Sequence, residues 1–151
     1  MTNEELKQSL GQYFPSATYE ESGEFLNMLI SSEELLPVMK KLAAKNDFSF
    51  DYLFCLTCVD WKTHLTMMYH LLSKTYKHTI VVKAKITDCN NPLIETVCSL
   101  WKTANFHERE VYDLFGVKFI NHPDLRRILL DESWEGYPLR KNYVDENMIA
   151  L

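Results

Sequence analysis

Two cysteines three positions apart, Cys55 and Cys58, have the spacing of one half of a zinc or iron–sulfur site. They lie within an alternating apolar run, and residues three apart on a strand point to opposite faces. The run also lacks the turn residues that fold two thiolates toward one metal. Cys89 and Cys98 supply no recognisable second half. The pattern predicts that Cys55 and Cys58 are small buried side chains in a reducing compartment and are not metal ligands.

A second group of chemically capable residues runs from His107 to Glu110, with His122 downstream. Histidines and carboxylates are suitable metal ligands and proton carriers. The zincin pattern is absent, because no second histidine lies four positions beyond His107. A free-standing hydrolase or metalloenzyme that uses His107, Glu110 and His122 remains as one interpretation, and it requires bound metal in the purified chain.

Helical spacing favours a structural role for the same segment. One predicted helix face is apolar except for a single carboxylate and consists of Trp101, Ala104, Glu108, Val111, Tyr112 and Phe115. A desolvated carboxylate needs a positive partner. The aperiodic C-terminal segment offers three candidates, Arg126, Arg127 and Arg140. We therefore predict that arginine–carboxylate pairs clamp this segment to Glu108, Glu110 and Asp113.

The elements that position these residues follow from periodicity. Thr2 and Glu5 form a capping box for a short helix that closes near Gly11 and Pro15. Two strands are expected over residues 17–21 and 25–30. Ser31 with Glu34 is a second capping box, and the helix after it buries Leu35, Met39, Leu42 and Ala43.

The middle of the chain changes to a period of two. Residues 50–59 predict a central strand, with one face made of Phe50, Tyr52, Phe54, Leu56 and Cys58. Residues 65–73 and 78–87 predict two more strands, and the short links allow only an antiparallel meander. A helical stretch with a break near Ala104 is expected from Asn90 to Phe115. Gly116 then occupies its left-handed C′ position.

These elements predict an α+β fold with two layers, in which helices pack on one side of a mixed, largely antiparallel sheet. Residues 1–117 form the α+β domain, and residues 118–151 form an extended C-terminal arm of the same structural unit. The arm contains residue types that dominate protein interfaces, including Trp134, Tyr137, Arg140 and Tyr143. Composition alone does not decide between docking to a partner and packing within the chain.

Composition excludes several classes of function. A net charge of −5 argues against binding to a phosphate backbone, so we expect no nucleic acid partner. Four glycines cannot form a P-loop or a dinucleotide fingerprint. The apolar runs are too short for a membrane span, and the start of the chain lacks a secretion signal, which indicates the cytoplasm.

The C-terminal third carries motifs that closely resemble one family. In order they are Glu108-Arg109-Glu110, Asp113-Leu114-Phe115-Gly116, His122-Pro123-Asp124-Leu125-Arg126-Arg127-Ile128-Leu129 and Gly136-Tyr137-Pro138-Leu139-Arg140-Lys141. They resemble the signature of the 30 kDa subunit, also called the C subunit, of respiratory complex I, the proton-translocating NADH:quinone oxidoreductase.

The resemblance implies a scaffold protein of the peripheral arm on the cytoplasmic side of the inner membrane. Its partners would be the quinone-site (D) subunit and the iron–sulfur (B) subunit. Flavin, iron–sulfur clusters and quinone would lie on other subunits, with no cofactor or metal on this chain, which would be inactive alone. The implied signature and clamp residues are Glu108, Arg109, Glu110, Asp113, His122, Asp124, Arg126 and Arg127. The implied docking residues are Trp134, Tyr137, Pro138, Arg140, Lys141 and Tyr143.

Two departures from the family pattern concern the docking arm. Asn142 replaces an aspartate that usually follows the Arg-Lys pair, and the sequence stops soon after Tyr143, which suggests a smaller footprint on the partners. Related subunits also serve membrane-bound hydrogenases and other quinone- or phenazine-linked complexes. The motifs do not distinguish between these complexes, so we expect NADH as the electron donor, as in the commonest case.

Overall fold

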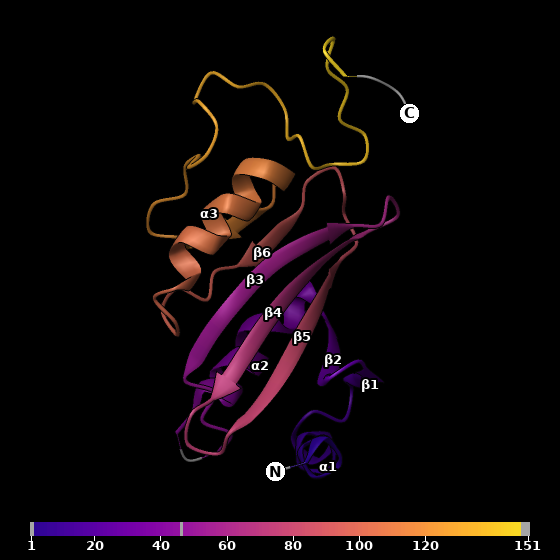
Figure 1. The fold of residues 1–151 in the computed structure, drawn as a ribbon, viewed down its shortest axis with the longest axis vertical. Helices are drawn as coiled ribbons and strands as arrows, with labels where there is room; N and C mark the ends of the chain where they lie inside the picture. The colour runs from indigo at the N-terminus through magenta and orange to yellow at the C-terminus, as the bar shows by residue number, and fades with distance from the viewer. Residues whose placement is uncertain (1, 46, 149–151) are drawn as a thin grey trace.

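The computed structural model describes residues 2–45 and 47–148, so the last three residues of the predicted arm lie outside it. Its elements are α1 (Asn3–Tyr13), β1 (Thr18–Ser22), β2 (Phe25–Ser31), η1 (Ser32–Glu34), α2 (Leu35–Ala43), β3 (Tyr52–Asp60), β4 (Leu65–Ser73), β5 (His78–Ile86), β6 (Leu93–Glu95), α3 (Ala104–Phe115) and β7 (Lys118–Ile120). The fold is α+β, as predicted (Figure 1).

The main sheet joins an N-terminal hairpin to a meander. Its order is β1-β2-β5-β4-β3, and both β1–β2 and the predicted meander β3–β4–β5 are antiparallel. The two halves meet in one parallel pairing, in which Leu26 of β2 lies opposite Ile80 of β5. The sheet is therefore mixed and largely antiparallel. Strands β6 and β7 pair in parallel as a second, two-stranded sheet.

The predicted capping box at Thr2 is confirmed. The Thr2 hydroxyl accepts a hydrogen bond from the Glu5 N–H at 3.2 Å, and the Thr2 N–H donates to the Glu5 carboxylate at 2.9 Å. The prediction of a second capping box, formed by Ser31 and Glu34, is wrong. The Ser31 hydroxyl donates instead to the Glu34 carboxylate, a 3-10 turn intervenes, and α2 begins at Leu35. The buried residues of α2 include Val38, whereas Ala43, which was predicted to be buried, is only half-buried.

Strand β3 departs from prediction in two ways. It lies at the edge of the sheet and not at its centre. A β-bulge between Leu53 and Cys55 adds a residue, so Leu53 is buried with Leu56, while Phe54 is exposed on the other side. The predicted common face of Phe54 and Leu56 is therefore wrong.

Helix α3 covers this edge. It packs against β3. The segment just before α3 donates two hydrogen bonds, one to β3 itself and one to Phe50, which precedes β3. The Trp101 indole donates to the Phe50 carbonyl at 2.9 Å, and the Thr103 hydroxyl donates to the Leu53 carbonyl at 2.8 Å. Protein contacts thus replace the strand partner that an edge strand lacks.

The stretch from Asn90 to Thr103 is not helical. Only Ala104–Phe115 forms a helix, and strand β6 occupies part of the predicted helical stretch. Its partner β7 lies in a segment expected to be irregular. Strands of three residues are too short to show alternation in the sequence. The expected end of the helix is confirmed, because Gly116 has φ 78° and donates to the Tyr112 carbonyl.

The two faces of the main sheet differ in burial. On β4, Leu65, Met67, Tyr69 and Leu71 are buried in the core, and the residues between them are half-buried on the opposite, open face. Figure 1 shows α2 behind the sheet and α3 beside β3, with the C-terminal arm at the same end as α3. Within the described residues, no helix is both long enough and apolar enough to cross a membrane.

Candidate functional site: the anchored C-terminal arm

A buried ion pair joins the C-terminal arm to α3. The Arg127 guanidinium donates to the Asp113 carboxylate at 2.9 Å, and the side chains are 10% and 0% exposed. The same guanidinium donates to the carbonyls of Trp134 and Gly136 at 3.1 and 3.0 Å. Arg127 therefore fixes both the attachment of the arm and the path of its next turn.

Backbone groups of the arm complete the environment of Asp113. Its Oδ2 accepts hydrogen bonds from the N–H groups of Ile128, Leu129 and Leu130 at 3.3, 2.7 and 3.0 Å. Burial acts to raise the pKa of Asp113, but the Leu130 and Leu129 N–H groups and the Arg127 guanidinium outweigh it. The net pKa lies below its usual value, so the carboxylate is charged at neutral pH.

Arg109, on the same helix, holds the arm by its backbone. It is 8% exposed, and its guanidinium donates to the carbonyls of Arg126 and Arg127 at 3.2 and 3.1 Å. The Arg126 side chain turns outward and pairs with Asp124, and both are more than half exposed. The neighbouring arginines of the motif therefore have different environments, one buried and one solvated.

A second anchor lies further along the arm. Arg140 pairs with Asp60, at the end of β3, at 3.1 Å, and the Lys141 N–H donates to the same oxygen at 2.9 Å. Arg140 also donates to the Cys89 carbonyl at 2.7 Å and the Phe115 carbonyl at 3.3 Å. Although burial acts to raise the Asp60 pKa, the Lys141 and Lys62 N–H groups and Arg140 hold it below its usual value.

The predicted clamp is therefore partly wrong. Glu108 is fully buried but meets no arginine among the described residues, because Thr96 and Val97 surround its carboxylate. Burial raises its pKa to about 7. Glu110 is exposed and likewise lacks an ion pair within the described residues. The actual partner of Arg140 is Asp60, which sequence reasoning missed. The only sequence feature that could have indicated Asp60 is its position as an acidic residue at the end of an apolar strand.

The ligand set suggested for a metalloenzyme is not assembled. His122 lies near Glu108 and Cys98, and one ligand atom from each of these three falls within 4.8 Å of the others. His107 and Glu110 are not in this group, the one such cluster that the described part of the chain contains. Cys58 is buried, and burial raises the pKa of its thiol to about 12, as suits a core residue.

The predicted docking residues divide into inward and outward groups. The Tyr137 ring packs against Gly116 and lies 5.1 Å from the Arg127 guanidinium, so it serves internal packing. Arg140 is largely buried, while Pro138 and Tyr143 are half-buried. Trp134 and Lys141 are exposed.

Sequence reasoning missed further exposed apolar side chains on the arm. We call them the apolar arm surface: Leu129, Leu139, Val144 and Met148, with 65%, 51%, 86% and 55% exposure. Their spacing has no period that could have marked them. Exposed apolar groups gathered on one segment favour contact with another protein.

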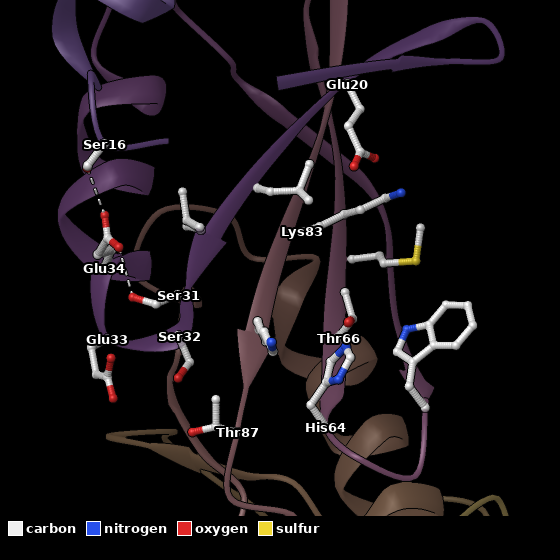
Figure 2. A pocket seen from close by; sticks show the side chains of 15 residues that line it. Ser16, Glu20, Ser31, Ser32, Glu33, Glu34, His64, Thr66, Lys83 and Thr87 are labelled. Atoms are coloured by element: carbon white, nitrogen blue, oxygen red, sulfur yellow. Dashed lines mark hydrogen bonds between the residues drawn. The ribbon is translucent and has the colours of Figure 1, made fainter. Parts of the chain in front are cut away.

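The open face of the sheet holds a cavity of about 510 Å³ (Figure 2). Side chains from β2, β4, β5 and the β3–β4 turn line it, and Lys83 and Glu20 give it both charges. Trp61, which also lines the cavity, is 59% exposed. Among the described residues that line the cavity, no serine or threonine hydroxyl is hydrogen-bonded to the His64 ring, so no nucleophile–base pair is assembled there.

The fold and the anchors define a class of small α+β domains whose long C-terminal extension is fixed by buried arginine–carboxylate pairs. Residues 28–147 match the family described as respiratory-chain NADH dehydrogenase, 30 Kd subunit. The C subunit of NADH-quinone oxidoreductase from Moorella thermoacetica is 38% identical over 90% of this chain and 91% of its own length. The chain therefore belongs to the 30 kDa subunit family of complex I, the family of the NADH-quinone oxidoreductase C subunit.

Two further relatives extend this result. The NADH-quinone oxidoreductase C/D subunit of Phocaeicola vulgatus is 42% identical over 81% of this chain, and the match spans only 23% of that longer protein. A chain of the membrane-bound sulfane sulfur reductase, an archaeal respiratory membrane complex, has the same fold, with a TM-score of 0.79 and 26% identity. That match covers 93% of this chain and 85% of the archaeal one.

Proposed function

We propose that this chain is a peripheral-arm scaffold and docking subunit of a proton-translocating NADH:quinone oxidoreductase. It supports electron transfer from NADH to quinone, while the flavin, the iron–sulfur clusters and the quinone site lie on partner subunits. The observation that carries the proposal is the arm itself, since two buried ion pairs fix an extended segment that turns four apolar side chains to solvent. A segment held in this way is suited to contact a partner.

The expected first partner is the quinone-site (D) subunit. Relatives named C/D combine both designations in a single protein, which supports a direct contact between the two. We expect the iron–sulfur (B) subunit to be the second neighbour. On this proposal the chain reaches the cytoplasmic side of the inner membrane only through the complex.

One observation favours a second candidate. The similar archaeal chain belongs to a membrane-bound sulfane sulfur reductase, so the same fold also occurs in another respiratory membrane complex. An equivalent role in a membrane-bound hydrogenase or another complex-I-like oxidoreductase is therefore the alternative. The scaffold function of the arm is the same in both.

Co-purification from the source organism tests the proposal. The tagged chain is recovered from mildly solubilised membranes, and the co-eluting subunits are identified. A quinone-site subunit together with a flavin-containing NADH module supports the proposal. Subunits without an NADH module support the alternative, and recovery of the chain alone contradicts both.

A variant pair locates the docking surface. Val144→Asp places a charge on the apolar arm surface, and we expect it to reduce recovery of the partners at least tenfold. Tyr76→Asp is the matched control, because Tyr76 is 44% exposed in the β4–β5 turn at the opposite end of the molecule (Figure 1). Equal recovery with both variants would contradict docking through the arm.

A further inference from the structure

Three separate segments bring potential metal ligands together beside α3. Cys98 follows β6, Glu108 lies on α3, and His122 follows β7. One ligand atom from each lies within 4.8 Å of the others, and the Cys98 sulfur is 3.8 Å from both Glu108 oxygens. Ligands at about 2.0–2.3 Å from a tetrahedral zinc ion are roughly 3.3–3.8 Å apart. The Cys98–Glu108 separation matches this spacing, and the 4.8 Å limit of the whole cluster means that binding zinc draws the ligands closer by up to about 1 Å.

The Glu108 carboxylate is already oriented as a ligand. It is fully buried, and no lysine or arginine pairs with it among the described residues. The Thr96 hydroxyl and the Val97 N–H donate to it at 2.7 and 2.9 Å. Buried charges are normally paired or bound to a metal, and outer hydrogen bonds of this kind orient metal ligands.

The interior beside Glu108 contains another polar group. The Tyr69 hydroxyl is fully buried and has no hydrogen-bond partner among the described residues. The charge of Glu108 is one of the causes that raise the Tyr69 pKa, after burial itself. Tyr69 therefore supplies no positive charge to the carboxylate.

The His122 ring is held by two hydrogen bonds, and one of them must be given up when the ring binds a metal. Its Nδ1 accepts the Asp124 N–H at 3.0 Å, and its Nε2 lies 3.2 Å from the Asn105 carbonyl. Coordination exchanges one of these hydrogen bonds for a bond to the metal. The exchange is local, because both existing partners are backbone groups near the protein surface.

We propose that Cys98, Glu108 and His122 bind a divalent transition metal, with Zn²⁺ the best fit. Sulfur and imidazole donors favour zinc over magnesium or calcium, which prefer oxygen ligands alone. The metal displaces the Cys98 thiol proton, and the Glu108 carboxyl proton where it is present, to solvent, and no electron is transferred. A cavity of about 450 Å³, lined in part by Thr96 and Cys98, gives solvent access for a fourth ligand.

The bound metal would cross-link the segment after β6, helix α3 and the beginning of the arm. Zinc has no redox chemistry, so this role is structural and separate from electron transfer. None of the site's three ligands belongs to the apolar arm surface. The site's existence can therefore be tested without any partner subunit.

Metal titration of the full-length chain, purified without a histidine tag and treated with chelator, tests the site. Co²⁺ is used first, because a cysteine ligand gives a thiolate-to-cobalt absorption band, and Zn²⁺ is then used in competition. We expect one equivalent to bind. Cys98→Ser should abolish the band and weaken Zn²⁺ binding by more than the roughly 10- to 100-fold loss typical of removing an outer hydrogen-bond partner.

Cys89→Ser is the matched control, because Cys89 is also a half-buried free cysteine but lies outside the cluster. It should keep the band and the affinity. Far-ultraviolet circular dichroism of the metal-free variants establishes that both fold. Failure to bind one equivalent at micromolar concentration, or an unchanged band in Cys98→Ser, would overturn the metal site and leave the docking function unaffected.

Discussion

The Arg127 guanidinium and the Asp113 carboxylate meet at 2.9 Å almost entirely out of contact with water. The pair joins the last turns of α3 to the arm, and every oxygen of Asp113 has a hydrogen-bond partner. The attachment of an otherwise irregular segment therefore depends on one satisfied, charged contact. Its strength follows from burial, since exposed ion pairs contribute little.

Arg127→Met should destabilise the chain strongly. It leaves the buried Asp113 charge unpaired, which costs about 3–5 kcal/mol. The measurement is the free energy of unfolding from urea titration. Arg126→Met is the matched control, because the adjacent Arg126–Asp124 pair is exposed and is worth at most about 1 kcal/mol. Similar losses for both variants would show that the buried pair has no special role.

The lowered pKa of Asp113 predicts a specific loss of stability in acid. A carboxyl group whose folded pKa lies below its unfolded value, about 3.9, stabilises the fold above that value. This contribution is lost as pH falls through the folded pKa. Asp113→Asn should therefore be less stable than the parent at pH 7, with a difference that shrinks below about pH 4. A difference independent of pH would contradict the assignment.

Gly116→Ala should be more harmful than a substitution at another left-handed glycine. Gly116 has φ 78°, and an added Cβ would lie 2.6 Å from the Tyr137 ring. Gly23 has φ 76° with open space around it. Both variants lose about 1–2 kcal/mol from backbone strain, and Gly116→Ala loses about 1–3 kcal/mol more from overpacking. Thermal unfolding measures both, and equal losses would show that Tyr137 moves freely.

The second anchor can be separated from the first by hydrogen exchange. Arg140→Met removes the contacts to Asp60 and to the carbonyls of Cys89 and Phe115. We expect faster exchange at the amides of residues 139–143, at least tenfold, with the amides of β4 unchanged. Faster exchange throughout the sheet would indicate global destabilisation and not release of the arm.

Local patterns were enough to predict the meander, the first helix and the end of α3. Each is specified by neighbours in sequence, such as the Thr2–Glu5 capping box and Gly116 at C′. The bulge beside Leu53 was not predictable, because an inserted residue leaves the alternation readable in either register. The short strands β6 and β7 depend on pairing with each other, which no local period records.

Of the ion pairs predicted for the clamp, all between residues that the structure describes, one forms and the others do not. Asp113 and Arg127 do meet, as expected from an acidic helix facing an arginine-rich arm. Within the described residues Glu108 meets no arginine, because its carboxylate accepts hydrogen bonds from Thr96 and Val97 that sequence spacing could not reveal. Arg140 reaches Asp60, and only the three-dimensional path of the arm brings those two residues together.

The parallel pairing of β2 with β5 has a consequence for synthesis of the chain. The β1–β2 hairpin is synthesised before β5. The edge of β2 that will pair with β5 therefore stays unpaired until His78, the first residue of β5, emerges. At about 5–20 residues per second, this interval is roughly 2 to 9 seconds. Unpaired edges invite pairing with other chains. The nascent N-terminal hairpin is therefore a segment for which we expect chaperone protection before assembly.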